Sequence, residues 1–153
     1  MSLRTGRRLL LMLAAPVVLA SCYSFAQPSF HPGDARQVLS AIARRGVDIE
    51  TTTAGASACP DPGLVPNSML LRGSVVSDRV QRDVWIYTFR EKSWASSQAA
   101  VDACQAAFQS AHPGSVITRI DIPTYRAFGA DWSTELADSV RGGLKEASHM
   151  GEQ

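Results

Sequence analysis

The side chains that most often carry catalysis are scattered along this 153-residue chain. His31 lies in a proline-rich stretch, His112 at the end of a predicted helix and His149 near the C-terminus, and these positions favour solvated imidazoles over catalytic bases. The acids have no spacing typical of a glycosidase pair. The chain contains no dinucleotide, P-loop, zinc-protease, EF-hand or serine-hydrolase motif. We therefore predict no catalytic residue, no metal ligand and no cofactor.

One segment has the composition of a recognition loop. Residues 123–132 read Pro-Thr-Tyr-Arg-Ala-Phe-Gly-Ala-Asp-Trp, with three aromatic rings, one arginine and one glycine. Rings supply contact area and arginine supplies directed donors. The candidate recognition residues are Tyr125, Arg126, Phe128 and Trp132. The alternative is that the rings plug the edge of the core where the last helix docks.

A second aromatic group follows the period of a strand. Trp85, Tyr87 and Phe89 alternate with apolar residues in the strongest strand pattern of the chain. A strand that is apolar on both faces belongs in the middle of a sheet. This stripe would be a ligand platform if left uncovered and a core layer if a helix packs on it.

The N-terminus has the pattern of an export signal. Arg4, Arg7 and Arg8 precede an almost uninterrupted apolar run from Leu9 to Ala20. A positive segment followed by a short apolar segment is typical of a signal peptide. The run is shorter than the roughly 20 residues of a transmembrane helix, so we do not expect it to remain as a span.

The end of this run, Leu19-Ala20-Ser21-Cys22, resembles the lipobox of bacterial lipoprotein precursors. The resemblance covers only the first 22 residues. It implies cleavage after residue 21, acylation of Cys22 as the lipid attachment site, and an extracytoplasmic protein anchored to a bacterial membrane, whether inner, outer or sole. Several acyl chains would anchor it stably. The alternatives are an ordinary secretory signal cleaved near Ala26, or a chance cysteine in a cytoplasmic leader.

The charge balance argues against a nucleic-acid partner. The whole chain has 15 Lys+Arg, 14 Asp+Glu and a formal charge of +1. The predicted signal peptide removes three arginines and no acid, which leaves the mature chain slightly acidic. A nucleic-acid binder needs a basic surface, so we expect none to bind. The hydrophobic content of 45% also excludes a disordered chain.

Two cysteines remain once Cys22 is assigned to lipid. An exported chain meets oxidising conditions, so Cys59 and Cys104 are predicted to form a structural disulfide. A redox pair usually has C-x-x-C spacing, and zinc needs about four ligands, which the scattered histidines do not complete. Two buried free thiols are the other alternative.

Hydrophobic periodicity and capping residues predict the helices and strands that carry the candidate side chains. Residues 54–67 are rich in proline and glycine, which is typical of a loop. Ser93 and Ser133 are placed to cap the two later helices. Val47, Ile49 and Thr51 are expected to face inward. The predicted elements are a helix at 33–45, a strand at 47–51, a loop at 54–67, a hairpin of strands 69–76 and 84–89, a helix at 93–112, a strand at 115–122 and a helix from 133 to about 147.

This order predicts one α+β domain over residues 33–150, after a signal peptide (1–21) and a lipidated tether (22–32). We expect an antiparallel or mixed sheet of about four strands with helices packed on it, and a ferredoxin-like arrangement is the closest common pattern. The mature chain resembles small uncharacterised bacterial lipoproteins, which implies no particular activity. We expect a binding or accessory module of the cell envelope, whose partner is an envelope protein or small ligand. A small envelope hydrolase and a purely structural component are the alternatives.

Overall fold

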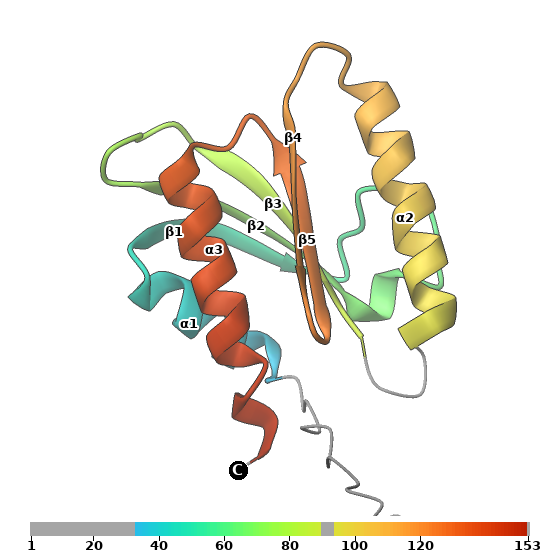
Figure 1. Ribbon diagram of the computed structural model, residues 1–153, viewed down its shortest axis with the longest axis horizontal. Helices are drawn as coiled ribbons and strands as arrows, with labels where there is room; N and C mark the ends of the chain where they lie inside the picture. Colours follow the sequence, from blue (N-terminus) through green and yellow to red (C-terminus); the bar gives the residue numbers. More distant parts are fainter. Residues whose placement is uncertain (1–32, 90–93, 153) are drawn as a thin grey trace, which may run out of the picture.

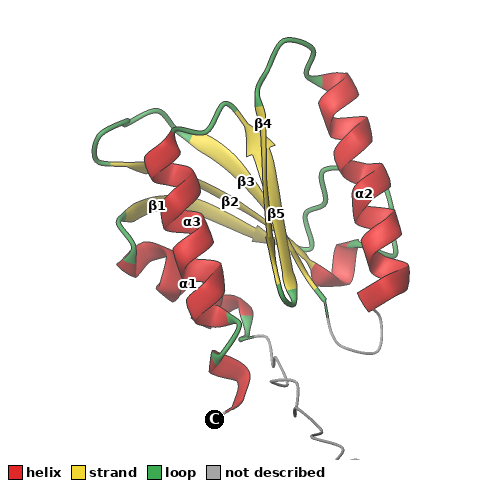
Figure 2. Ribbon diagram, in the orientation of Figure 1, coloured by secondary structure: helices red, strands yellow, loops and turns green. Residues whose placement is uncertain are grey.

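A five-stranded antiparallel sheet forms the centre of the protein (Figures 1 and 2). The computed structural model describes residues 33–89 and 94–152, apart from the side chains of residues 94–96 and 152. The strand order is β1-β2-β3-β5-β4, and each neighbouring pair is antiparallel. The strands are β1 (Val47–Ala54), β2 (Ser68–Val75), β3 (Arg82–Thr88), β4 (Ile117–Ile122) and β5 (Tyr125–Ala130).

Helices cover both faces of this sheet. In Figure 1, α1 (Ala35–Arg44) and α3 (Thr134–Ala147) lie together on one face, and α2 (Trp94–Ala111) lies on the opposite face. Short 3-10 turns occur at Val65–Asn67 and Met150–Glu152. Within the described part of the chain, no helix is long and apolar enough to cross a membrane.

The two faces carry separate hydrophobic cores. The larger core lies under α1 and α3, where Ile42, Leu136 and Leu144 pack against the side chains of one sheet face. The smaller core lies under α2, where Phe108 and Cys104 meet rings from the other sheet face. The protein is therefore an α+β domain of three layers, and the α+β class is confirmed.

Local sequence signals explain both ends of α1 and the start of α3. Asp34 and Gln37 form a capping box at the start of α1. Gly46 follows α1 with φ +91°, a conformation that strongly favours glycine. The Ser133 side chain accepts from the Leu136 N–H and caps α3 as predicted. The predicted cap of α2, Ser93, lies outside the described residues.

The sheet has five strands where the sequence predicted about four, and the strand that was not predicted is β5. It pairs with β4 through a two-residue turn in which Pro123 is followed by Thr124 at φ +73°. It also pairs with β3 and is therefore internal to the sheet. The arrangement is not ferredoxin-like, because helices cover both faces of the sheet and its strand order is β1-β2-β3-β5-β4.

The expected burial of strand 47–51 was correct only in part. Val47 is buried and Ile49 is partly buried, but Thr51 is exposed. The register between β1 and β2 shifts between Ile49 and Thr51. Such an irregularity interrupts the strict alternation of faces on which the prediction relied.

Gly142 and Gly143 lower the helix propensity of α3. Gly143 also allows α3 to pack closely on α1. A Cβ atom built on Gly143 would lie 2.7 Å from the Cα of Ile42, closer than two carbons can approach. A Cβ on Gly142 would meet only the Arg45 side chain, at 3.4 Å. The helix crossing therefore needs glycine at position 143 and tolerates a methyl group at 142.

These two glycines give a matched pair of substitutions. Gly142→Ala should raise the free energy of unfolding by up to about 1 kcal/mol, because alanine has the higher helix propensity. Gly143→Ala should lower it by about 1–3 kcal/mol, because the added methyl group overpacks the helix crossing. Urea denaturation of both variants beside the parent measures the difference. A stabilising Gly143→Ala would contradict the close crossing.

Candidate functional site

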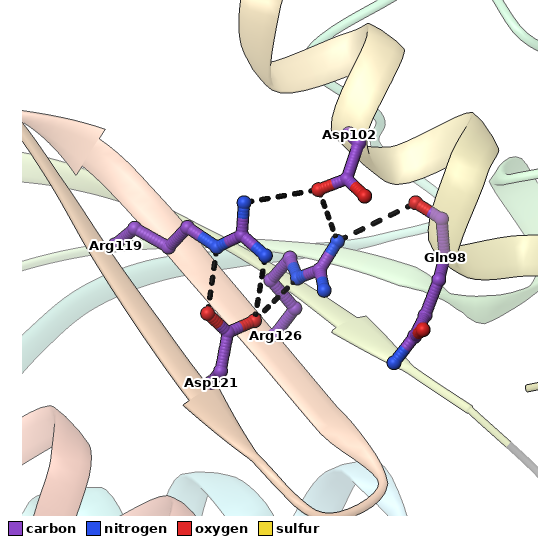
Figure 3. A network of polar contacts seen from close by, with 5 residues as sticks. All are labelled: Gln98, Asp102, Arg119, Asp121 and Arg126. Atoms are coloured by element: carbon purple, nitrogen blue, oxygen red, sulfur yellow. Dashed lines mark hydrogen bonds and ion pairs between the residues drawn. The ribbon is translucent and has the colours of Figure 1, made fainter.

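Arg126 lies inside the protein. Its side chain is 5% exposed, and it points from β5 toward α2 (Figure 3). Its Nε donates to Asp121 Oδ1 at 2.6 Å, and its Nη1 donates to Asp102 Oδ1 at 2.8 Å. The same Nη1 lies 3.4 Å from the Gln98 carbonyl oxygen. A guanidinium held in this way joins the sheet to α2 and is not presented to a partner.

Arg119 completes this ion-pair network. It donates to both oxygens of Asp121 and, through Nη1, to Asp102 at 2.9 Å. Both acids are half exposed, at 50% and 53% of their side chains. Partial burial raises the pKa of Asp121, but the hydrogen bonds and charges of Arg119 and Arg126 outweigh it and hold that pKa below its ordinary value.

The other three candidate recognition residues are also buried. Tyr125 is 1% exposed and donates from its hydroxyl to the Gly33 carbonyl oxygen at 3.0 Å; burial raises its pKa to about 12. Phe128 is fully buried under α2. Trp132 is 9% exposed, and its indole N–H donates to the Asp83 carbonyl oxygen at 3.0 Å.

The interpretation of this segment as an exposed recognition loop was therefore wrong. Residues 125–130 form an internal strand whose side chains alternate between the two cores, so both of its faces are covered. Trp132 lies at the end of the larger core, close to α3, as the alternative interpretation expected. A loop was predicted because Pro123 and Gly129 are typical of turns. Gly129 is needed for a different reason, since a Cβ there would lie 2.4 Å from the Trp132 indole nitrogen.

The predicted disulfide is confirmed. Cys59, in the loop after β1, is bonded to Cys104 on α2. The Tyr87 hydroxyl lies beneath it, 3.4 Å from the Cys104 sulfur. It accepts from the Ala58 N–H at 3.0 Å and contacts the Ser57 hydroxyl at 3.1 Å. The disulfide, the loop and β3 therefore meet at one point of the smaller core.

The aromatic stripe of β3 divides into a covered part and an open part. Tyr87 and Phe89 are 1% and 2% exposed beneath α2, so they form a core layer. Trp85 faces the same side of the sheet but is only partly buried. The helix thus covers two of the three rings and leaves the first at its edge.

Trp85 lies in a cleft of about 560 Å³. The cleft has the sheet as its floor, and the last turn of α2 and the disulfide loop contribute to its walls. Its volume falls within the range of small-molecule sites in proteins, about 300–1,000 Å³. Residues of β1, β2, β3, β5, α2 and the loop meet there. The lining residues are Glu50, Ala58, Arg72, Gln81, Arg82, Asp83, Trp85, Phe108, His112 and Ala130.

The Trp85 indole presents carbon to this cleft. Its nitrogen is buried and has no hydrogen-bond partner among the described residues. Since the residue as a whole is only partly buried, the exposed portion is the carbon surface of the ring. The cleft therefore contains a stacking surface at Trp85, and the indole N–H is turned away from it.

Two further rings form part of the wall. Phe108 and His112 stack with their centroids 4.1 Å apart and their planes at 30°. His112 Nδ1 lies 2.8 Å from the Phe108 carbonyl oxygen, which can only accept, so Nδ1 carries the hydrogen. In neutral His112, Nε2 is then the acceptor.

The charged groups of the cleft balance one another. Arg72 and Asp83 form a bidentate pair, with nitrogen–oxygen distances of 2.7 and 3.1 Å. Arg82 donates to the carbonyl oxygens of Asp131 and Gln81. Glu50 supplies a second carboxylate. Two cations and two anions leave no net charge while His112 is neutral.

The sequence indicated only part of this cleft. Trp85 belonged to the stripe described as a possible ligand platform, but Arg72, Arg82, Asp83 and Phe108 carried no functional signal. They come from three elements, β2, β3 and α2, which the strand order and the end of α2 bring together. No group of described residues has the composition of a metal site.

Comparison with known proteins gives no relative. No protein family model, no curated protein and no solved structure matches the chain.

The ion-pair network of Figure 3 predicts that removing the two acids lowers the free energy of unfolding more than removing Arg126 does. Asp102→Asn combined with Asp121→Asn should lower the free energy of unfolding by about 3–5 kcal/mol, because it leaves the Arg126 charge buried without a counter-charge. Arg126→Met should cost less, since water can solvate the half-exposed acids. Thermal or urea unfolding at neutral pH measures both. Equal costs would contradict the asymmetry.

The pH dependence of the stability provides a control for the role of Asp121 in this network. Because folding lowers the Asp121 pKa, the stability that this group contributes is present above its unfolded pKa and is lost as the pH falls through its folded pKa. The difference in stability between the parent and Asp121→Asn should therefore shrink in acid.

Proposed function

We propose that this protein is a membrane-anchored extracytoplasmic lipoprotein whose domain binds a small ligand in the Trp85 cleft. The lipobox-like segment that ends at Cys22 supports the location. It lies outside the described residues, as does the predicted tether up to residue 32. The Cys59–Cys104 disulfide is consistent with export, because such bonds persist in oxidising compartments.

The binding role rests on one observation: Trp85 remains partly exposed in a cleft of about 560 Å³, while the two other rings of its stripe are buried beneath α2. A pocket with ring surfaces and a few polar groups is typical of a ligand site. Catalysis is less favoured, because the polar groups of the cleft bond to one another or to main-chain oxygens. No nucleophile–base hydrogen bond joins the described side chains that line it.

Anchoring is tested at Cys22. Cys22→Ser should abolish partitioning into detergent and incorporation of labelled fatty acid, because the serine hydroxyl does not replace the acylated thiol. Cys22→Ser combined with Ser24→Cys should also fail, because the cysteine is displaced from the lipobox by two positions. Membrane association of either variant at the parent's level would overturn the lipoprotein assignment.

Ligand binding is tested by a fragment screen. The full chain in detergent, labelled with ¹⁵N, should show chemical-shift changes at Trp85 and His112 with some members of a small-molecule library. Trp85→Ala should abolish them, because the main stacking surface is lost. Arg36→Ala, on the exposed face of α1, is the control and should change nothing. A library that leaves the cleft residues unperturbed would contradict a ligand-binding role.

A further inference from the structure

The chemistry of the Trp85 cleft narrows the class of ligand. We infer that it binds an uncharged pyranose sugar, as a short glycan or a glycan end; this inference rests on the proposed binding role of the cleft. Three features support it: the ring surface, the balanced charges and the nature of the cleft floor.

The ring surface fits the apolar face of a sugar. A pyranose presents axial C–H groups on its faces and hydroxyls at its rim. The exposed part of Trp85 is carbon, since its N–H is buried, so the ring can stack on a C–H face without supplying a hydrogen bond. The stacked pair of Phe108 and His112 stands in the wall of the same cleft. Large aromatic rings gain most from such face contacts.

The charged groups fit the rim of a sugar better than they fit an ion. Each hydroxyl both donates and accepts, so it can bond to a carboxylate and to a guanidinium at once. The Arg72–Asp83 pair and the side chains of Glu50 and Arg82 offer both kinds of partner within one cleft. A charged ligand would gain little, because the positive and negative groups cancel.

The cleft floor disfavours an extended peptide. Peptides that bind as strands use the free main-chain groups of an edge strand. The floor is formed mainly by β2, β3 and β5, which are internal strands whose main-chain groups are directed to their neighbours. These three strands therefore offer the ligand side chains, as in the recognition of a sugar ring.

The test uses the full chain in detergent and isothermal titration calorimetry. The probes are cellotetraose, chitotetraose, maltotetraose and mannotetraose, with a tetragalacturonate as the acidic probe and an uncharged tetra-alanine peptide as the peptide probe. At least one neutral glycan should bind, and the acidic and peptide probes should bind at least about tenfold more weakly.

Variants at Trp85 separate stacking from hydrogen bonding. Trp85→Ala should weaken binding of the glycan by about tenfold or more, because the stacking surface is removed. Trp85→Phe should retain affinity within about threefold, because the indole N–H does not face the ligand. Arg36→Ala should bind as the parent does. A glycan that binds equally well to Trp85→Ala would overturn the inference, because its site would lie elsewhere.

The remaining outcomes distinguish this inference from the proposed function. Binding of the peptide or the acidic probe without any neutral glycan would overturn the sugar assignment. The sugar assignment would also be overturned if no probe binds while the fragment screen still perturbs Trp85 and His112. In that case the binding role of the cleft would stand. Failure of both experiments would overturn the two proposals together.

Discussion

The attachment of α2 to the sheet is the constraint on which the candidate site depends. The helix is fixed at its middle by the Cys59–Cys104 disulfide, above the Tyr87 hydroxyl, and on its flank by the ion pair of Asp102 with Arg126. Closing a loop of 45 residues is worth about 4 kcal/mol in the chain-entropy model, a large part of the net stability of a small domain. Because α2 is held here and ends at Ala111, Tyr87 is covered and Trp85 is left at the edge.

The ion pairs beside the disulfide show how the Arg126 charge can be buried beneath α2 at a modest desolvation cost. Burying both members of a pair is expensive, because both lose water. Here only Arg126 is buried, while its two acidic partners keep about half of their exposure. Arginine suits this arrangement because its planar guanidinium donates in several directions. The network therefore stabilises the docking of α2 and also determines which face of β5 lies beneath it.

Much of the fold could be predicted from local patterns. The helices at 35–44 and 134–147 and the hairpin of β2 and β3 follow from periodicity and capping residues. The disulfide follows from pairing the two cysteines that remain once Cys22 is set aside. The strand β5 could not be predicted in this way, because a strand with both faces covered has no polar alternation, and Pro123 and Gly129 are typical of turns. Its arginine resembled a surface residue until Asp102, 24 positions earlier, proved to be its partner.

The cleft was harder to predict from the sequence than the fold, because its lining depends on where α2 ends.

The start of the described domain lies on the side of the sheet opposite the cleft. Gly33 bonds to the last turn of α3 through its N–H and to the Tyr125 hydroxyl through its carbonyl oxygen, on the face of the larger core. The cleft lies on the face of α2. If Cys22 carries the lipid, a tether of about 11 residues spans at most roughly 40 Å. In the proposed lipoprotein, the domain would stay close to the membrane, attached through the α1 and α3 face. The sheet would separate the cleft from that attachment and leave it open to a ligand.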